Sequence, residues 1–167
     1  MTQKEEDVIS TWALESLKYE GDLVEIGLGY GETTIKLLKL AKQYGRKVIG
    51  IDPFEGEMPE SYRYSYEKFC SAIEGYEDYF ILLKEKSNCQ KARDIVNRPI
   101  CFAYVDGLQY ADAVLSDIYL VENANIIMVD DFDRDGTISQ VPRAVYYYME
   151  STERKLTDLG RWALLTK

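Results

Sequence analysis

The stretch that decides the expected fold is Val24-Glu25-Ile26-Gly27-Leu28-Gly29-Tyr30-Gly31-Glu32-Thr33-Thr34. An apolar run enters this stretch, three glycines alternate through its middle, and an amphipathic segment follows it. Glycine permits a sharp turn and lets the backbone approach a ligand closely. A helix that begins after such a turn presents free N–H groups, which Thr33 is expected to cap. The stretch therefore predicts a strand-to-helix turn that holds a ligand.

The rest of the chain repeats this alternation of short apolar runs and longer amphipathic segments. Short apolar runs bounded by Gly, Asp or Pro predict strands that are buried on both faces. Helices between such strands imply a mostly parallel sheet with helices on both faces. Near the end, two short runs flank Gly160 and predict an antiparallel hairpin. We expect one α/β domain over residues 1–167, with strands at 23–27, 47–52, 79–84, 100–106, 125–131, 155–158 and 162–166, and helices within 1–20 and at 33–44, 62–75, 90–97, 112–122 and 138–152.

A carboxylate ends the second expected strand. Asp52 lies 25 residues after Gly27, a spacing that suits an acid accepting both ribose hydroxyls of an adenosine. A dinucleotide-binding fold would place its third glycine where this chain has Glu32. Glu25 would repel a pyrophosphate, but it suits a cationic ligand such as an amino-acid ammonium. A tight turn without any ligand stays open as the alternative.

Two further expected strands also end in carboxylates, at Asp106 and at the pair Asp130 and Asp131. Parallel strands end at the same sheet edge, so these three acids should converge. Converging carboxylates need a cation or a raised pKa, and hard oxygen ligands suit Mg²⁺ or Ca²⁺. Neither motif contains a basic residue, so we expect a metal site here. The alternative is that Asp130 or Asp131 caps a helix or faces water. Residues 131–138 match the first eight positions of an EF-hand loop. The twelfth position, which should be a Glu, is Pro142, so an EF-hand is not expected.

Composition narrows the function further. The 167 residues include no histidine, which excludes Ser-His-Asp and Cys-His catalysis and histidine-based metal sites. A net charge of −9 argues against nucleic acid or an anionic membrane as the main partner. The N-terminus lacks the pattern of a signal peptide, and no apolar run is as long as a membrane span. We therefore expect a cytoplasmic protein.

The glycine loop 25–31 and Asp52 resemble the first two motifs of class I S-adenosylmethionine-dependent methyltransferases, which have a Rossmann-like fold. The resemblance implies that the loop holds the methionine part of the cofactor and that Asp52 holds its ribose. It also implies that residues 53–54 flank the adenosine and that residues 87–88 lie near the adenine. The cofactor-binding set implied in this way is Glu25, Gly27, Gly29, Gly31, Thr33, Asp52, Pro53, Phe54, Ser87 and Asn88.

A narrower resemblance rests on Val105-Asp106-Gly107-Leu108-Gln109 and Val129-Asp130-Asp131-Phe132. These segments are similar to those of sugar O-methyltransferases related to macrocin O-methyltransferase. The resemblance implies that Asp106, Asp130 and Asp131 bind Mg²⁺, or Ca²⁺ in its place, and that Asp106 is catalytic. That branch usually reads Asp-Gly-Asp-His, where the second Asp or the His is the base. This chain has Leu108 and Gln109 there instead, so it lacks the usual base.

The expected function is a metal-assisted O-methyltransferase that acts on a sugar or polyol hydroxyl. Two alternatives stay open. One is a degenerate member that binds the cofactor without turnover, which the loss of the base motivates. The other is a nicotinamide-dependent oxidoreductase. The expected partner is a small-molecule acceptor, with neither nucleic acid nor membrane, and a homo-oligomer is compatible with the sequence.

Overall fold

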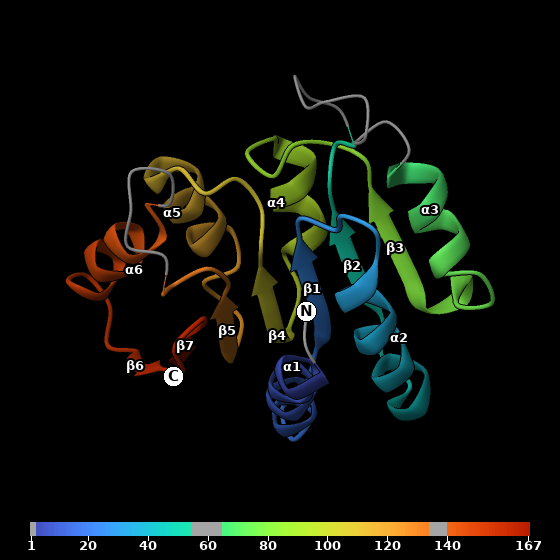
Figure 1. Cartoon of the computed structure of the whole chain (residues 1–167), viewed down its shortest axis with the longest axis horizontal. Helices are drawn as coiled ribbons and strands as arrows, with labels where there is room; N and C mark the ends of the chain where they lie inside the picture. Colours follow the sequence, from blue (N-terminus) through green and yellow to red (C-terminus); the bar gives the residue numbers. More distant parts are fainter. Residues whose placement is uncertain (1–2, 55–64, 134–139) are drawn as a thin grey trace.

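The structure is a computed structural model that describes residues 3–54, 65–133 and 140–167. Within these residues, strands in the order β3-β2-β1-β4-β5-β7-β6 form one sheet (Figure 1). The pairs among β1 to β5 are parallel, β7 is antiparallel to β5, and β6 is antiparallel to β7. The expected mostly parallel sheet with a C-terminal hairpin is therefore confirmed. The strands are β1 (Asp22–Ile26), β2 (Val48–Ile51), β3 (Phe80–Leu83), β4 (Ile100–Val105), β5 (Ile126–Val129), β6 (Lys155–Asp158) and β7 (Ala163–Thr166).

Helices cover both faces of this sheet, as the alternation of segments predicts. Helices α1 (Gln3–Ser16) and α2 (Glu32–Tyr44) pack on one face, and α4 (Gln90–Val96), α5 (Ala111–Leu120) and α6 (Val141–Met149) pack on the other. A further helix, α3 (Ser65–Ala72), precedes a short 3-10 helix, η2 (Glu77–Tyr79). The helix expected at 62–75 is described only from Ser65 onward. No helix in the described ranges is long and apolar enough to cross a membrane.

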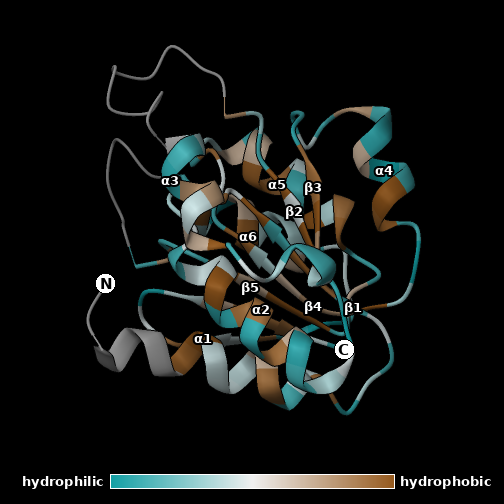
Figure 2. Ribbon diagram, turned by 90° about the vertical axis from the view of Figure 1, so that its right-hand side faces the viewer, coloured by the Kyte–Doolittle hydropathy of each residue, from teal (hydrophilic) through white to brown (hydrophobic). Residues whose placement is uncertain are grey.

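The hydrophobic core lies on both sides of the sheet because alternate strand residues point to opposite faces. Leu23, Phe102 and Ile126 pack against α1 and α2, whereas Val24, Ala103 and Ile127 pack against α4, α5 and α6. Figure 2 shows the resulting largely hydrophobic strands between helices in which hydrophilic and hydrophobic residues alternate. Burial on both faces explains why β1, β2, β4 and β5 read as nearly continuous apolar runs.

The carboxyl ends of the parallel strands share one edge, at the top of Figure 1. The C-terminal hairpin adds one residue to this edge from far along the chain. Its turn includes Gly160, which has a positive φ of 75°, and it places Arg161 two residues before β7. The Phe132 N–H donates to the Arg161 carbonyl at 2.7 Å, so the hairpin turn is attached to the end of β5. This edge is where the candidate site lies.

Candidate functional site

The glycine loop makes direct backbone contact with the end of β4. Gly27 has a φ of 85°, and a Cβ atom added to it would lie 2.1 Å from the carbonyl oxygen of Asp106. Any other residue at position 27 would push the two strand ends apart. The Asp106 N–H also donates to the Ile26 carbonyl at 2.8 Å. The loop therefore joins the expected cofactor residues to the expected acidic residues at one sheet edge.

Asp52 connects this loop to the segment that follows β2. Its Oδ2 accepts the N–H of Leu28 at 2.8 Å, and its Oδ1 accepts the N–H of Phe54 at 2.7 Å. Phe54 has a φ of 48°, in the left-handed region that side chains rarely adopt. Each carboxylate oxygen can accept a second hydrogen bond. The buried carboxylate thus orders the loop and keeps acceptor capacity for a ribose.

Glu25 is a buried carboxylate beside the glycine loop. It is 1% exposed, and its Oε2 has no hydrogen-bond partner in the described part of the chain. Burial raises its pKa well above the ordinary value, and repulsion from Asp106 and Asp52 adds to the rise. A buried carboxylate with unused acceptor capacity fits a cationic group such as an ammonium. The structure therefore suits the role that the sequence analysis gave Glu25.

Thr33 does not cap α2, so that prediction is wrong. The N-cap is Gly31, in the left-handed conformation at φ 85°, and no side chain caps the helix. The turn closes early because the Gly31 N–H donates to the Leu28 carbonyl, and Ile35 already donates back to Gly31. Thr33 is therefore the second residue of the helix and is nearly buried.

An aromatic wall follows Asp52 along the chain. The Phe54 ring lies 5.0 Å from the Tyr66 ring and 5.2 Å from the Phe69 ring, and Leu28 belongs to the same apolar group. Pro53 joins Asp52 to this wall and is half-buried. The wall is a group of tilted rings that adds apolar surface beside the glycine loop, where the resemblance puts the adenosine.

Ser87 and Asn88 lie at the other side of this edge. Both line a cleft of about 540 Å³ that runs between α4 and α5. Ser87 also hydrogen-bonds to the buried carboxyl of Asp117, whose pKa burial raises to about 6. A Cβ atom added to Gly107 would lie 3.1 Å from Asp117 Oδ2. Asp117, on α5, therefore lies between the loop after β3 and the loop after β4.

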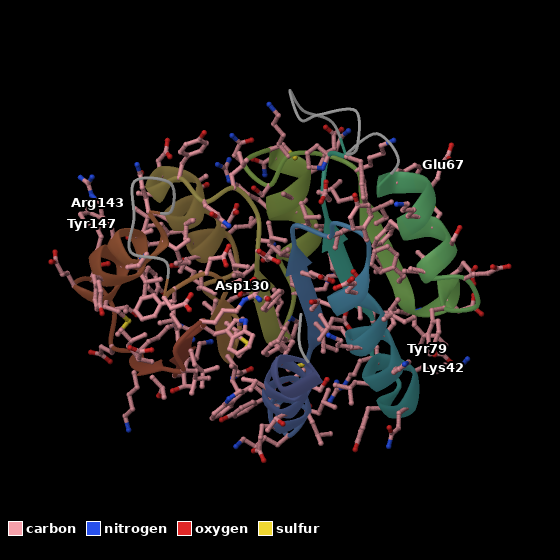
Figure 3. All side chains as sticks on the ribbon, viewed as in Figure 1. Lys42, Glu67, Tyr79, Asp130, Arg143 and Tyr147 are labelled. Carbon is pink, nitrogen blue, oxygen red and sulfur yellow. The ribbon has the colours of Figure 1, made fainter. Side chains whose placement is uncertain are left out.

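The three acids at the ends of β4 and β5 converge as predicted. One carboxylate oxygen from each of Asp106, Asp130 and Asp131 lies within 4.8 Å of the others, and we call this group the acid cluster. Figure 3 places Asp130 inside the molecule near these strand ends, whereas Arg143 and Tyr147 point outward. Asp106 reaches solvent, but partial burial and repulsion from Asp130 and Asp131 raise its pKa to about 8. Three hard oxygen donors at this spacing fit a divalent cation.

Neither acidic motif contains a basic residue, but the acid cluster has a basic partner from elsewhere in the chain. Arg161 donates from Nε to Asp130 Oδ1 and from Nη2 to Asp130 Oδ2, both at 2.7 Å. The carboxylate raises the pKa of Arg161 above its ordinary value. Sequence reasoning missed this partner because Arg161 lies 31 residues away, in the turn of an antiparallel hairpin. A metal bound at Asp130 would therefore meet a guanidinium already in place.

Leu108 and Gln109 occupy the positions where the resembled sugar O-methyltransferases have their base. Leu108 is exposed, and Gln109 donates from Nε2 to Asp131 Oδ2. The Gln109 carbonyl also accepts the N–H of Gln140 at 3.0 Å, which ties this loop to the start of α6. Gln109 thus organises the edge of the acid cluster, but it offers no group that could take a proton at neutral pH.

A buried phenol beneath the acid cluster was also missed. Tyr104 is 1% exposed, and burial, with added repulsion from Asp106 and Asp130, raises its pKa above the ordinary value. The period of a strand gives the signal that could have found it, because Tyr104 precedes Asp106 by two residues and shares its face. Trp162 lies beside Tyr104 in the same hydrophobic cluster.

Comparisons with known proteins agree with this architecture. A family model described as a methyltransferase domain matches residues 24–132, which is more than half of the chain. No curated protein is similar enough to this sequence to count as a relative. Among solved structures, the chain is similar to CalS11, a TDP-rhamnose 3'-O-methyltransferase of calicheamicin biosynthesis, with 17% identity, coverage of 98% of this chain and 78% of that chain, and a TM-score of 0.74.

Two other solved structures are similar over the whole chain. An O-methyltransferase from Bacillus cereus in complex with S-adenosylhomocysteine has 14% identity and a TM-score of 0.68, with coverage of 100% of this chain and 82% of that chain. An rRNA methylase from Streptococcus thermophilus has 17% identity and a TM-score of 0.64, with coverage of 100% and 98%. At these identities the likenesses concern the fold, and they confirm the expected Rossmann-like architecture.

Proposed function

The chain belongs to the methyltransferase-domain family, and from that premise we propose that it transfers the methyl group of S-adenosylmethionine to a hydroxyl of a sugar or similar polyol. The observation that carries the cofactor is the loop at 25–31 held against Asp52, within the residues that match the family. The likeness to a TDP-rhamnose 3'-O-methyltransferase supports a sugar acceptor. A net charge of −9 disfavours RNA, although one similar fold is an rRNA methylase.

Different residues at this sheet edge would bind different parts of the cofactor. The cofactor supplies a sulfonium whose methyl group is already electrophilic, so the protein mainly positions two reactants. Glu25 would accept from the ammonium, because its buried Oε2 has no other partner among the described residues. Asp52 would accept from the ribose, and Phe54 would face the adenosine. Ser87 and Asn88 would border the adenine from the loop after β3.

Methyl transfer forms a C–O bond to the acceptor, breaks the C–S bond of the sulfonium and releases the hydroxyl proton. Leu108 and Gln109 cannot take this proton. Asp106 is the member of the acid cluster that reaches solvent, so it is the carboxylate that can meet an acceptor hydroxyl. We propose Asp106 as the catalytic residue, with Asp130 and Asp131 behind it.

The acid cluster has the oxygen donors that Mg²⁺ or Ca²⁺ prefers, and Asp106, Asp130 and Asp131 would hold the ion. A bound divalent ion lowers the pKa of a coordinated hydroxyl, which would offset the missing base. The ion pair between Arg161 and Asp130 opposes this occupancy, because an ion bound at Asp130 would lie beside the positive charge of the guanidinium. The contact between Arg161 and Asp130 therefore counts against metal assistance more than against any other part of the proposal.

A second candidate function is cofactor binding without turnover, and the absence of a base at Leu108 and Gln109 favours it. The nicotinamide alternative is weaker, because the buried Glu25 would lie against a pyrophosphate in that loop. A test of turnover therefore separates the first two candidates, and a test of cofactor binding separates both from the nicotinamide alternative.

Binding and turnover can be measured on the same preparation. Calorimetry with S-adenosylhomocysteine should give saturable binding, and NADH should give none. Methyl transfer should then be followed with methyl-labelled S-adenosylmethionine over a panel of free sugars, TDP-rhamnose and an rRNA fragment. Labelled sugar product supports the proposal, and binding without any product supports the second candidate. A protein that binds NADH and not S-adenosylhomocysteine would contradict both.

A further inference from the structure

We propose that Arg161 is an internal cation of the acid cluster, and that a divalent ion binds the cluster only by displacing the Arg161 guanidinium from Asp130. The inference rests on the metal-binding part of the proposed function and concerns what this chain adds to it. The acid cluster is the group formed by Asp106, Asp130 and Asp131. Among the described residues, Arg161 forms an ion pair with Asp130 of this cluster.

The contact is a two-point ion pair with one buried partner. The Asp130 side chain is 2% exposed and the Arg161 side chain is 28% exposed. Both bonds measure 2.7 Å, which is short for N–H···O and typical of a charge-assisted pair. A planar guanidinium bound through two nitrogens occupies both oxygens of the carboxylate on that side. An ion that binds the remaining lone pairs of Asp130 would lie directly beside this guanidinium, whose like charge repels it.

Hydrogen bonding fixes the backbone around Arg161, but the side chain can rotate away from Asp130. The Arg161 carbonyl accepts the N–H of Phe132 at 2.7 Å, and β7 begins two residues later. The guanidinium stands at the end of a flexible stem, partly open to solvent, with the Trp162 ring 5.6 Å away. It can leave Asp130 by rotation of its own side chain, and the hairpin does not have to move.

Charge explains why the two cations exclude each other. Without a cation, the negative charges of Asp106, Asp130 and Asp131 repel one another at this short spacing. Arg161 relieves part of that repulsion, because its guanidinium donates two hydrogen bonds to the Asp130 carboxylate. A divalent ion relieves it further, but beside a guanidinium it meets like charge. The cluster thus has two alternative occupants, and Arg161 sets the concentration at which the ion replaces it.

The test compares ion binding by the full chain and by Arg161→Gln, without cofactor or acceptor. Calorimetric titration with CaCl₂ and with MgCl₂ should show at least 10-fold tighter binding to Arg161→Gln than to the wild type. The variant should also unfold at a lower temperature without the ion and gain more from its addition, because binding stabilises the folded state. Arg98→Gln is the matched control, because it removes an arginine paired with Asp22, 3.7 Å away at the opposite sheet edge.

Equal affinity in the wild type and Arg161→Gln would overturn the proposal, and so would the absence of ion binding by every form. If Arg161→Gln does not fold, the wild type still tests it by NMR of the Arg161 Nε–H, assigned with Arg161→Lys. That signal should shift toward its free position as CaCl₂ is added, and a signal that stays unchanged while the ion binds would contradict displacement. S-adenosylhomocysteine binding by the same samples reports on the proposed function separately.

Discussion

The N–H of Leu28 donates to Asp52 Oδ2 at 2.8 Å, so the carboxylate that should hold the cofactor ribose also holds the glycine loop. The two residues are 24 positions apart and belong to different strand-to-helix connections. Asp52 is buried, and its other oxygen accepts from Phe54. Its loss should therefore affect both cofactor affinity and loop order.

Asp52→Ala should weaken binding of S-adenosylhomocysteine by about 2 kcal/mol, roughly 30-fold, through loss of charge-assisted hydrogen bonds. Calorimetry measures the effect directly. Asp78→Ala is a suitable control, because Asp78 is exposed in η2, before β3, and should leave affinity unchanged. Undiminished affinity in a folded Asp52→Ala protein would remove Asp52 from the ribose site.

Glu25→Gln should separate stability from cofactor binding. Burial raises the pKa of Glu25, which means that its charged form is costly in the folded protein without a ligand. The neutral amide should therefore raise the melting temperature without cofactor, by about 3 °C for each kcal/mol relieved in a chain of this size. It should also weaken S-adenosylhomocysteine, because the ammonium loses its charged partner.

Differential scanning calorimetry and a binding titration on the same protein check both parts of the Glu25 prediction. Asp112→Asn, which neutralises an exposed carboxylate on α5, serves as control and should change neither quantity. A Glu25→Gln protein that is less stable than the wild type yet binds as tightly would mean that Glu25 supports the fold and does not contact the ligand.

The stability of the folded protein should depend on pH through Asp117. Its pKa is about 6 in the folded state, against an ordinary value of 3.8, so the folded state holds this proton more tightly than the unfolded state. The contribution of this group to the free energy of unfolding is therefore greatest below about pH 4 and falls by about 3 kcal/mol as pH rises to about 6.

Asp117→Asn removes that titration and keeps an acceptor for Ser87. The difference in unfolding free energy between variant and wild type should rise in favour of the variant between pH 4 and pH 6, and then stay level. Urea denaturation at pH 4, 5, 6 and 7 measures it. A difference that does not change with pH would mean that Asp117 has an ordinary pKa.

The sheet and its acidic edge could be predicted from the sequence because both follow from local patterns. Strands buried on both faces appear as apolar runs, and parallel strands end at the same edge. Asp106, Asp130 and Asp131 needed only these two rules to be placed together, and the structure brings them within 4.8 Å of one another. Gly27 was expected to let the backbone approach a ligand, and the close approach that the structure shows is to the end of β4.

The parts that failed depend on long-range pairing or on fine backbone geometry. Arg161 reaches Asp130 only because β7 pairs antiparallel with β5, and no local signal in the sequence reports where a hairpin turn will point. Thr33 failed as a cap because Gly31, in the left-handed conformation, starts the helix earlier. The contact of Asp117 with Ser87 joins α5 to the loop after β3 and has no periodic signature.

The final prediction concerns the missing base. Leu108 is exposed, two residues after Asp106 of the acid cluster. It occupies the position where the resembled sugar O-methyltransferases have a carboxylate. Leu108→Asp should therefore raise the rate of methyl transfer near neutral pH by about 10²-fold, the lower end of what a positioned base contributes. The neighbouring Asp106 and Asp131 should raise the pKa of the added carboxyl, which suits a base that works near neutrality.

Leu108→Asn, of nearly the same size and without a titratable group, is the matched control and should leave the rate unchanged. The assay follows methyl transfer to the best acceptor of the sugar panel, from pH 5 to pH 9, at saturating cofactor. A gain in Leu108→Asp alone, appearing as the added carboxyl loses its proton, would identify the absent base as what limits the natural chain. An equal gain in both variants would point to the removal of the Leu108 side chain from the acceptor's path. No gain in a folded, cofactor-binding Leu108→Asp protein would mean that another group takes the proton, or that the chain binds the cofactor without turnover.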